Sequence, residues 1–169
     1  SASSSTSSTW WGIPSARWVE RPIRLAATGR VRICRPPASR AVVASLPDGR
    51  TIAAWGLTFK AGTDDLRDSP AIEIARQLVA EGAKVRAYDP EVAAGTSVLD
   101  GVEVLDDPYS CCDGADALVV LTEWPEFSRL DLDRVAGALS QRAVVDTRDV
   151  LDRVALRRRD FAYRGIGHT

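Results

Sequence analysis

The stretch RTIAAWGLTFKAGTDDLRDSPAIEIARQLVAEGAKVRAYDP, residues 50–90, contains a complete strand–helix–strand pattern. Its first part, residues 50–57, is an apolar run typical of a buried strand, and its last part, residues 84–90, alternates before a turn. The segment between them is amphipathic at helical spacing. Because a helical crossover joins parallel strands, the stretch predicts an α/β fold around a mostly parallel sheet.

The helix predicted over residues 69–83 is the best-defined element. Ser69 is a suitable N-cap, Pro70 suits the first helical position, and Gly82 supplies a C-terminal stop. Helical spacing places four apolar residues on one face: Ile72, Ala75, Leu78 and Val79. This face is expected to pack on the sheet.

The same alternation continues to the end of the chain. Further strands are predicted over residues 102–105, 116–122, 142–148 and 161–167, and further helices over residues 107–115, 130–139 and 149–159. The first of these strands is short enough for an edge, and the second is apolar enough for the centre. We therefore expect a Rossmann-like, three-layer α/β/α domain over residues 49–169, with a mostly parallel sheet of five or six strands.

Residues 1–48 differ from the rest of the chain. They begin with a low-complexity Ser/Thr segment and continue into a basic, proline-interrupted one, without sustained helix or strand periodicity. We predict an irregular N-terminal tail. Its tryptophans, Trp10, Trp11 and Trp18, could form an interaction segment or replace a missing interface, and the sequence does not choose between these roles.

Composition limits the partners and the compartment. Lys and Arg (22) balance Asp and Glu (23), so net charge does not indicate nucleic acid. The three cysteines, two of them adjacent, suit no disulfide framework, which predicts a cytoplasmic protein. No apolar run approaches the roughly 20 residues of a membrane span, so no membrane partner is expected. The absence of Met, even at position 1, suggests a fragment or a processed start.

A strongly charged loop, residues 58–68, follows the first predicted strand. Ligands of doubly wound sheets bind outside the carboxyl ends of strands, where the strand order reverses, and Thr147–Arg148 follows a later strand at the same end. Lys60 and Arg67 are therefore candidates to meet the phosphate oxygens of a ligand such as a nucleotide diphosphate, near the start of the helix.

An alternative is a solvated loop that pairs its own charges, with Thr63 and Asp64 bonding backbone N–H groups. The turn from the first strand to the helix also lacks the G-x-G-x-x-G fingerprint of dinucleotide binding, since its glycines, Gly56 and Gly62, stand six positions apart. Complete nicotinamide binding by this domain is therefore not expected.

Other chemically active residues are expected to be structural. Cys111 and Cys112 are adjacent, so they cannot easily chelate one tetrahedral metal ion, and no base is nearby; we interpret them as small helix residues, one of them buried. His168 is expected to be a frayed terminal residue. We predict no catalytic residue and no metal site in this chain.

Two further features are an arginine-rich stretch and a pair of aromatic residues. The arginine-rich stretch 153–159 ends a predicted helix, where cations complement the helix dipole, so we do not predict a nucleic-acid site. Trp124 and Phe127 follow the predicted central strand and should cap its end over the crevice. Packing against a neighbouring helix and contact with a ligand are both open for them.

Five motifs, in order, resemble a known family: WGLTFKAGTDDLRDSPA (55–71), AYDP (87–90), ALVVLTEWPEF (117–127), VVDTRDVLD (144–152) and YRGIG (163–167). They resemble the C-terminal, UDP-binding domain of the UDP-glucose/GDP-mannose dehydrogenase family, over about residues 48–167. Within the family, the bacterial enzymes that act on UDP-glucose look most similar.

The resemblance implies an activity and a set of ligands. Family members oxidise the C6 alcohol of a nucleotide sugar to a carboxylate in two NAD-dependent steps, through a thiohemiacetal on a cysteine, and work as dimers. The resemblance implies that Phe59 and Lys60 contact the UDP-sugar, that Arg148 reaches the substrate, in one arrangement across the dimer, and that Arg67 approaches NAD at the domain interface.

The sequence also departs from the family pattern. Nothing before Asp48 resembles the NAD domain, the catalytic-cysteine motif or the dimerisation helix. We therefore expect a UDP-sugar-binding domain that lacks its N-terminal NAD domain and is inactive alone, with a homodimer expected for the full-length enzyme. The sugar stays open between UDP-glucose, GDP-mannose and a UDP-N-acetylhexosamine. A non-catalytic remnant that acts by protein contact is the alternative.

Overall fold

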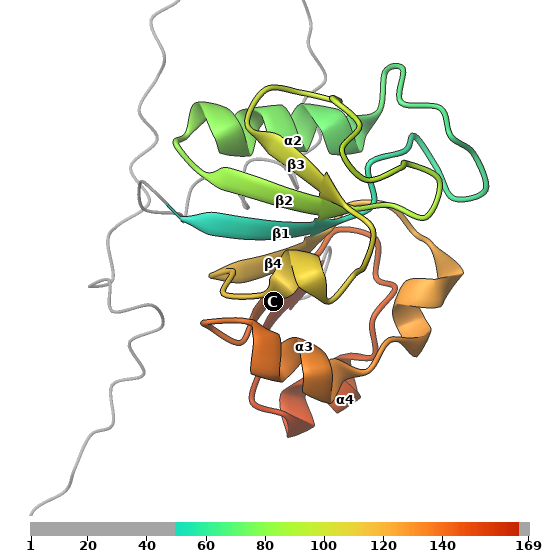
Figure 1. Cartoon of the computed structure of the whole chain (residues 1–169). Coiled ribbons are helices and arrows are strands. Elements are labelled where there is room, and N and C mark those ends of the chain that lie inside the picture. Colours follow the sequence, from blue (N-terminus) through green and yellow to red (C-terminus); the bar gives the residue numbers. More distant parts are fainter. Residues whose placement is uncertain (1–49, 166–169) are drawn as a thin grey trace, which may run out of the picture. The chain divides into compact units, whose positions relative to one another are not determined.

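The computed structural model describes residues 50–165, which contain one parallel sheet of six strands in the order β3-β2-β1-β4-β5-β6 (Figure 1). Every neighbouring pair of strands is parallel. The predicted α/β sheet is confirmed, and the strand count is six. The strands are β1 (Thr51–Trp55), β2 (Lys84–Tyr88), β3 (Val102–Leu105), β4 (Ala117–Val120), β5 (Ala143–Asp146) and β6 (Ala162–Gly165).

Helices cover both faces of the sheet. One face packs on α2, and the other packs on α3, α4 and two 3₁₀ turns, which gives the expected three layers (Figure 1). Three of the four predicted helices are present but shorter than expected, and the prediction of a helix over residues 107–115 is wrong, since that segment contains only a 3₁₀ turn. The bounds are α2 (Pro70–Ala80), η2 (Ser110–Cys112), η3 (Pro125–Arg129), α3 (Leu132–Ala138) and α4 (Arg153–Arg158).

The capping chemistry explains where the later helices begin. The carboxylate of Asp131 accepts hydrogen bonds from the second and third residues of α3, and Asp152 does the same for α4. Both residues are extended N-caps, so residues 130 and 149–151, predicted to be helical, lie before their helices. Arg157 and Arg158 occupy the last turn of α4, as the dipole interpretation requires.

Helix α2 begins as its sequence predicts. The Ser69 hydroxyl accepts from the backbone N of Ala71 (3.2 Å) and donates to the carbonyl of Leu57 (2.7 Å), which ties the helix to the end of β1. The buried face is rotated relative to the prediction: Ile72 and Val79 are only partly buried at its flanks, and its fully packed residues are Ala71, Ile74, Ala75 and Leu78.

The strand order reverses between β1 and β4, the two central strands. Their last residues align, since Trp55 is in register with Val120, and Val120 is in register with Asp146 of β5. The carboxyl ends of these strands therefore meet at one edge of the sheet, where a doubly wound fold binds ligands. The predictions of an edge strand over residues 102–105 and a central strand over residues 116–122 are confirmed.

An aromatic cluster fills the core beneath this edge. The Trp55 and Phe127 rings lie 5.2 Å apart between centroids, and both residues are fully buried. Trp55 Nε1 donates to the carbonyl of Pro108 (2.9 Å), and the thiol of Cys111 donates to the same oxygen (3.0 Å). Cys112 is also fully buried, and its thiol pKa is raised by the hydrogen bond with Cys111 and by burial. Both cysteines therefore pack in the core as small apolar side chains.

Some predictions fall on residues that the structure does not describe. The irregular tail over residues 1–48, its three tryptophans and the terminal His168 lie outside the described residues. Between residues 50 and 165, no helix combines the length and the apolar character needed to cross a bilayer.

Candidate functional site

A close contact joins the loops that follow β1 and β4. Gly56 has φ +90°, and a Cβ atom built on it would lie 2.5 Å from Cβ of Thr122. The Thr122 hydroxyl in turn donates to the carbonyl of Thr58 (2.9 Å). A side chain at position 56 would separate these loops, so glycine is required for the contact at the point where the strand order reverses.

Asp89, directly after β2, anchors the loop that follows β1. One of its carboxylate oxygens accepts from the backbone N of Leu57 (2.6 Å), from the backbone N and hydroxyl of Thr58 (both 3.0 Å) and from Nε1 of Trp124 (3.3 Å). Asp89 is only 2% exposed. With the backbone N of Glu91 on its other oxygen (3.0 Å), this buried carboxylate is stabilised by five hydrogen-bond donors and fixes the backbone just before residue 59.

Phe59 and Lys60 emerge from this anchored segment. Phe59 is 48% exposed, although its backbone N is held by the carbonyl of Asp65 (2.8 Å). The Lys60 side chain is exposed and makes no ion pair with any residue between 50 and 165. An exposed aromatic ring thus stands beside an available cation, a combination suited to the base or sugar and the phosphates of a nucleotide.

Arg67 is paired within the same loop. Its Nε and Nη2 lie 2.9 and 3.0 Å from the two carboxylate oxygens of Asp65, while the Arg67 side chain stays 87% exposed. The guanidinium lowers the pKa of Asp65 to about 2. Arg67 is therefore paired within the loop, as the alternative of a self-paired loop predicts. The hydroxyl of Thr63 also accepts a backbone N–H, that of Asp65, as the same alternative predicts. No hydrogen bond of Asp64 is found in the described part of the chain.

Arg148 lies over the end of β4. Its Nε donates to the carbonyl of Leu121 (2.8 Å) and stands 3.4 Å from a carboxylate oxygen of Glu123. Its side chain is 32% exposed, so the terminal nitrogens remain accessible to a ligand. A guanidinium held through Nε is oriented in advance, which favours bidentate contact with an oxyanion.

The turn that carries Arg148 is organised by Asp146, the last residue of β5. The Asp146 side chain is fully buried and accepts from the backbone N of Arg148 (2.9 Å), Val150 (2.8 Å) and Leu151 (2.9 Å). The hydroxyl of Thr147 donates to the carbonyl of Val120 (2.7 Å). Asp146 and Asp89 thus each hold the backbone of a loop through its N–H groups, one on each side of β4.

Together these bonds join three loops into one surface. Thr58 is bonded to Thr122, and Arg148 is bonded to Leu121, so the loops after β1 and β5 both lie against the end of β4. The structure brings Phe59, Lys60 and Arg148 to this edge, as the sequence predicts, with Arg67 in the same loop.

Trp124 and Phe127 prove to be packing residues. Phe127 is fully buried between Trp55 and Tyr88, and Trp124 is 8% exposed and donates to Asp89. The Tyr88 hydroxyl donates to a Glu126 carboxylate oxygen (2.9 Å), and its pKa is raised by burial and by that bond. These side chains pack in the core, and Trp124 helps to hold Asp89.

The sequence patterns predict no functional role for Asp89 or Asp146. A signal is present for Asp146, which ends an apolar strand, whereas Asp89 follows a strand of alternating character. Within residues 50–165, no group of three or more His, Cys, Asp and Glu side chains is placed to hold a metal ion. The surface instead offers cations and an aromatic ring, which suit an anionic, ring-bearing ligand.

Comparisons with known proteins agree with this chemistry. Residues 53–153 match the sequence model described as the UDP-binding domain of the UDP-glucose/GDP-mannose dehydrogenase family. The chain is 42% identical over 120 residues to a UDP-glucose 6-dehydrogenase of Rhizobium meliloti, and 39% identical over 126 residues to one of Pseudomonas aeruginosa. Each alignment covers 70% of this chain but only 28% of the relative.

The fold is also similar to solved structures. The chain matches the crystal structure of an NDP-N-acetyl-D-galactosaminuronic acid dehydrogenase from Methanosarcina mazei with a TM-score of 0.65 and 28% identity. That alignment covers 78% of this chain and 27% of the other. In sequence and in structure, the similarity is therefore to about a quarter of a larger dehydrogenase.

Proposed function

Since the chain belongs to the UDP-glucose/GDP-mannose dehydrogenase family, we propose that its crevice binds the UDP part of a nucleotide sugar. The activity we propose is that of an NAD-dependent UDP-glucose 6-dehydrogenase, which converts UDP-glucose to UDP-glucuronate. The relatives from Rhizobium meliloti and Pseudomonas aeruginosa carry that name, which supports this substrate.

Each site residue has a proposed role. Lys60 and Arg148 lie on opposite sides of the end of β4 and supply positive charge for the diphosphate. Phe59 offers an exposed ring for packing against the uracil or the sugar. The observation that carries the proposal is the hydrogen-bonded junction of three loops, which delivers these side chains to one edge.

The described residues do not fit the main site for NAD. The turn after β1 would have to let a pyrophosphate approach the backbone, but Gly56 is packed against Thr122, and the next residues, Leu57 and Thr58, are fully buried. We propose that NAD is held mainly by another part of the full-length enzyme, with Arg67, exposed and oriented by Asp65, reaching toward it.

The rest of the enzyme is proposed from its relatives. Because this chain spans 28% of their length, we propose that the catalytic cysteine, the NAD domain and the dimer contact belong to the part that it does not match. Turnover by the 169-residue chain alone is not expected. A UDP-N-acetylhexosamine is the alternative substrate, supported by the structural similarity to a dehydrogenase named for an N-acetylated sugar acid. GDP-mannose is a further alternative substrate, because the family also includes GDP-mannose dehydrogenases.

Calorimetric titration of the full 169-residue chain with UDP, UDP-glucose, GDP and NAD at low salt tests the proposal. We expect UDP and UDP-glucose to bind with similar affinity, because the diphosphate and uracil carry the contacts, and we expect no detectable binding of NAD. Preferential binding of GDP would move the assignment to the GDP-mannose branch. A folded chain that binds none of the four ligands would contradict a nucleotide site in this domain. It would favour the alternative of a non-catalytic remnant that acts by protein contact.

A further inference from the structure

Two residues that follow β4, Leu121 and Thr122, contact both loops that carry the cations of the crevice. The carbonyl of Leu121 accepts from Nε of Arg148 (2.8 Å), and the hydroxyl of Thr122 donates to the carbonyl of Thr58 (2.9 Å). The Leu121 carbonyl belongs to the planar peptide unit that joins these two residues. The contacts with the Arg148 side and with the Lys60 side are therefore made by adjoining parts of one short segment.

This segment is firmly held in the centre of the sheet. Leu121 and Thr122 are fully buried, and the backbone N of Leu121 donates to the carbonyl of Trp55 at the end of β1 (2.8 Å). The Thr122 side chain also packs so closely on Gly56 that it leaves no room for a Cβ atom there. Because a packed interior deforms little, the segment is a fixed reference for the loops on its two sides.

On the Lys60 side, the Thr122 hydroxyl acts on the backbone directly before the cation. The peptide unit between Thr58 and Phe59 is bonded at both of its polar atoms. Its carbonyl accepts from Thr122, and its N–H donates to the carbonyl of Asp65 (2.8 Å). The first of these bonds ties the peptide unit to β4, whereas the second lies within the loop. Loss of the hydroxyl would therefore let the loop move relative to β4.

We propose that Thr122 is a positioning residue that fixes the spacing of Lys60 and Arg148 and thereby favours a ligand with two linked phosphates. This inference rests on the proposed function, in which both cations bind one diphosphate. Because the cations lie on opposite sides of the end of β4, a diphosphate can meet both at once, and its affinity depends on their spacing. A single phosphate meets one cation and keeps that contact when the loops separate. Thr122 itself is buried and bonds only the backbone.

The test compares the affinities of UDP and UMP for the full 169-residue chain, measured by calorimetry. The two nucleotides share uracil and ribose, so a displacement of Phe59 affects both, and the ratio of their affinities reports the use of both cations. In the wild type we expect UDP to bind about 10- to 150-fold more tightly than UMP, the contribution of one hydrogen bond to a charged group. Because Thr122 is uncharged, its replacement changes this ratio through geometry alone.

Thr122→Ser and Thr122→Ala form a matched pair, because both lose the methyl group and only serine keeps the hydroxyl. We expect Thr122→Ser to keep the wild-type ratio and Thr122→Ala to lower it at least about twofold, the smallest effect expected for coupled residues. In the Lys60→Ala background, Thr122→Ala should leave the ratio unchanged, because one cation is already absent. Thr122→Val, which nearly keeps the shape of threonine, replaces Thr122→Ala if that variant does not fold.

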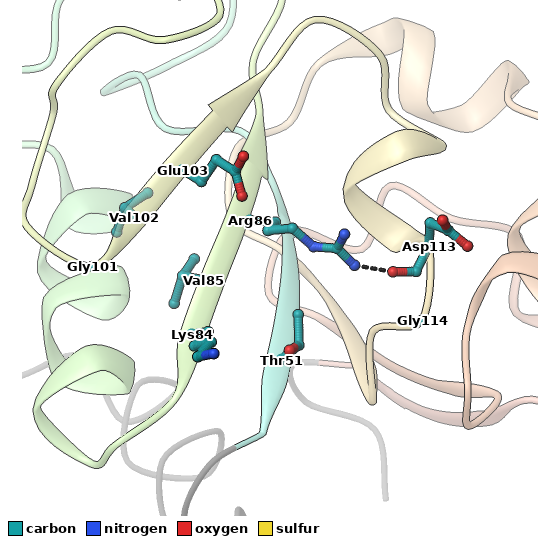
Figure 2. Close-up of a pocket in the computed structure, with 9 residues that line it drawn as sticks. All are labelled: Thr51, Lys84, Val85, Arg86, Gly101, Val102, Glu103, Asp113 and Gly114. Carbon is teal, nitrogen blue, oxygen red and sulfur yellow. Dashed lines mark hydrogen bonds between the residues drawn. The ribbon is translucent and has the colours of Figure 1, made fainter.

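A cation at the far end of the sheet provides the charge control. Lys84, the first residue of β2, lines a cavity of about 510 Å³ at the opposite end of the strands (Figure 2). The lining of this cavity is charge-balanced, with two cations and two carboxylates: Lys84, Arg86, Glu103 and Asp113. Figure 2 shows Arg86 directed at Asp113, whose carbonyl it bonds. Lys84→Ala should therefore change neither UDP nor UMP affinity, whereas Lys60→Ala should lower the ratio.

The ratio decides the outcome. The proposal is overturned if a folded Thr122→Ala variant keeps the wild-type ratio, if Thr122→Ser loses it as well, or if Thr122→Ala lowers it equally in the Lys60→Ala background. An equal loss of UDP and UMP affinity also overturns it, because Thr122 would then only support the fold. Absence of UDP binding in the wild type is a different result, which overturns the proposed function and this inference together.

Discussion

The carboxylate of Asp89 and the main chain of Thr58 meet across two neighbouring strand ends: a single Asp89 oxygen lies 3.0 Å from both the backbone N and the hydroxyl oxygen of Thr58. Thr58 is fully buried and also accepts the hydroxyl of Thr122 through its carbonyl. One residue of the loop after β1 is therefore bonded to the ends of both β2 and β4. The position of Phe59 and Lys60 depends on this junction.

Asp89→Asn tests the junction. The amide has one acceptor oxygen and replaces the other with an NH₂ donor, so a buried donor loses its partner or meets another donor. We expect a loss of about 1–3 kcal/mol in the free energy of unfolding, measured with urea, and weaker UDP binding. Asp64→Asn is the control, because Asp64 is exposed and should leave both quantities unchanged. Equal stability of the two variants would contradict the anchoring role.

Gly56→Ala tests the close approach to Thr122. Gly56 and Gly62 both have positive φ, at +90° and +77°, but a Cβ atom at Gly62 has no atom within 4 Å, whereas at Gly56 it would collide with Thr122. Gly62→Ala should therefore lower the free energy of unfolding only by the backbone strain, about 1–2 kcal/mol. Gly56→Ala should cost clearly more and lower UDP affinity, as measured by urea unfolding and calorimetry. Similar costs for the two variants would show that the loops can separate freely.

The sheet and the position of the crevice could be predicted because they depend on local patterns. The alternation in residues 84–90 and the apolar run of residues 116–122 predict strands, and parallel strands bring their carboxyl ends to one edge. The loops that carry Lys60 and Arg148 therefore lie at this edge, and the role of the two side chains as ligand contacts stays a prediction.

Contacts between distant residues could not be predicted in this way. Asp89 bonds residues 31 and 32 positions earlier, and an Asp–Pro pair after a strand is typical of a solvated turn. The helix expected over residues 107–115 fails for a similar reason: the carbonyl of Pro108 accepts Trp55 Nε1, from 53 positions away. In both cases tertiary bonding overrides the local pattern.

The pair of Asp65 and Arg67 predicts a pH dependence. Arg67 lowers the pKa of Asp65 from 3.8 to about 2. Because the folded-state pKa is depressed, the stabilisation is present above pH 3.8 and is lost as the pH falls through about 2. Carboxyl-carbon NMR should give an Asp65 midpoint near 2 in the wild type and a higher one in Arg67→Ala. An unchanged midpoint in that variant would mean that the pair does not form in solution.

Lys60→Ala and Arg148→Ala test whether one diphosphate lies between the two cations. Each should weaken UDP binding by about 10- to 150-fold, since a hydrogen bond to a charged group contributes about 1.5–3 kcal/mol. Lys60→Ala should keep the unfolding midpoint, because its side chain is exposed and unpaired with any residue from 50 to 165. Arg148→Ala should lower the unfolding midpoint slightly, because the hydrogen bond to the Leu121 carbonyl is lost.

The double variant distinguishes a shared ligand from two separate effects. If both cations hold the same diphosphate, removing one lets the phosphates shift toward the other, so the two losses in binding free energy should not add. Calorimetry of UDP with Lys60→Ala, Arg148→Ala and the double variant gives the coupling energy. We expect a coupling of at least about 0.5 kcal/mol, the lower bound for residues that share a partner. Strict additivity would contradict the crevice as a single site, because residues with no common partner lose affinity independently.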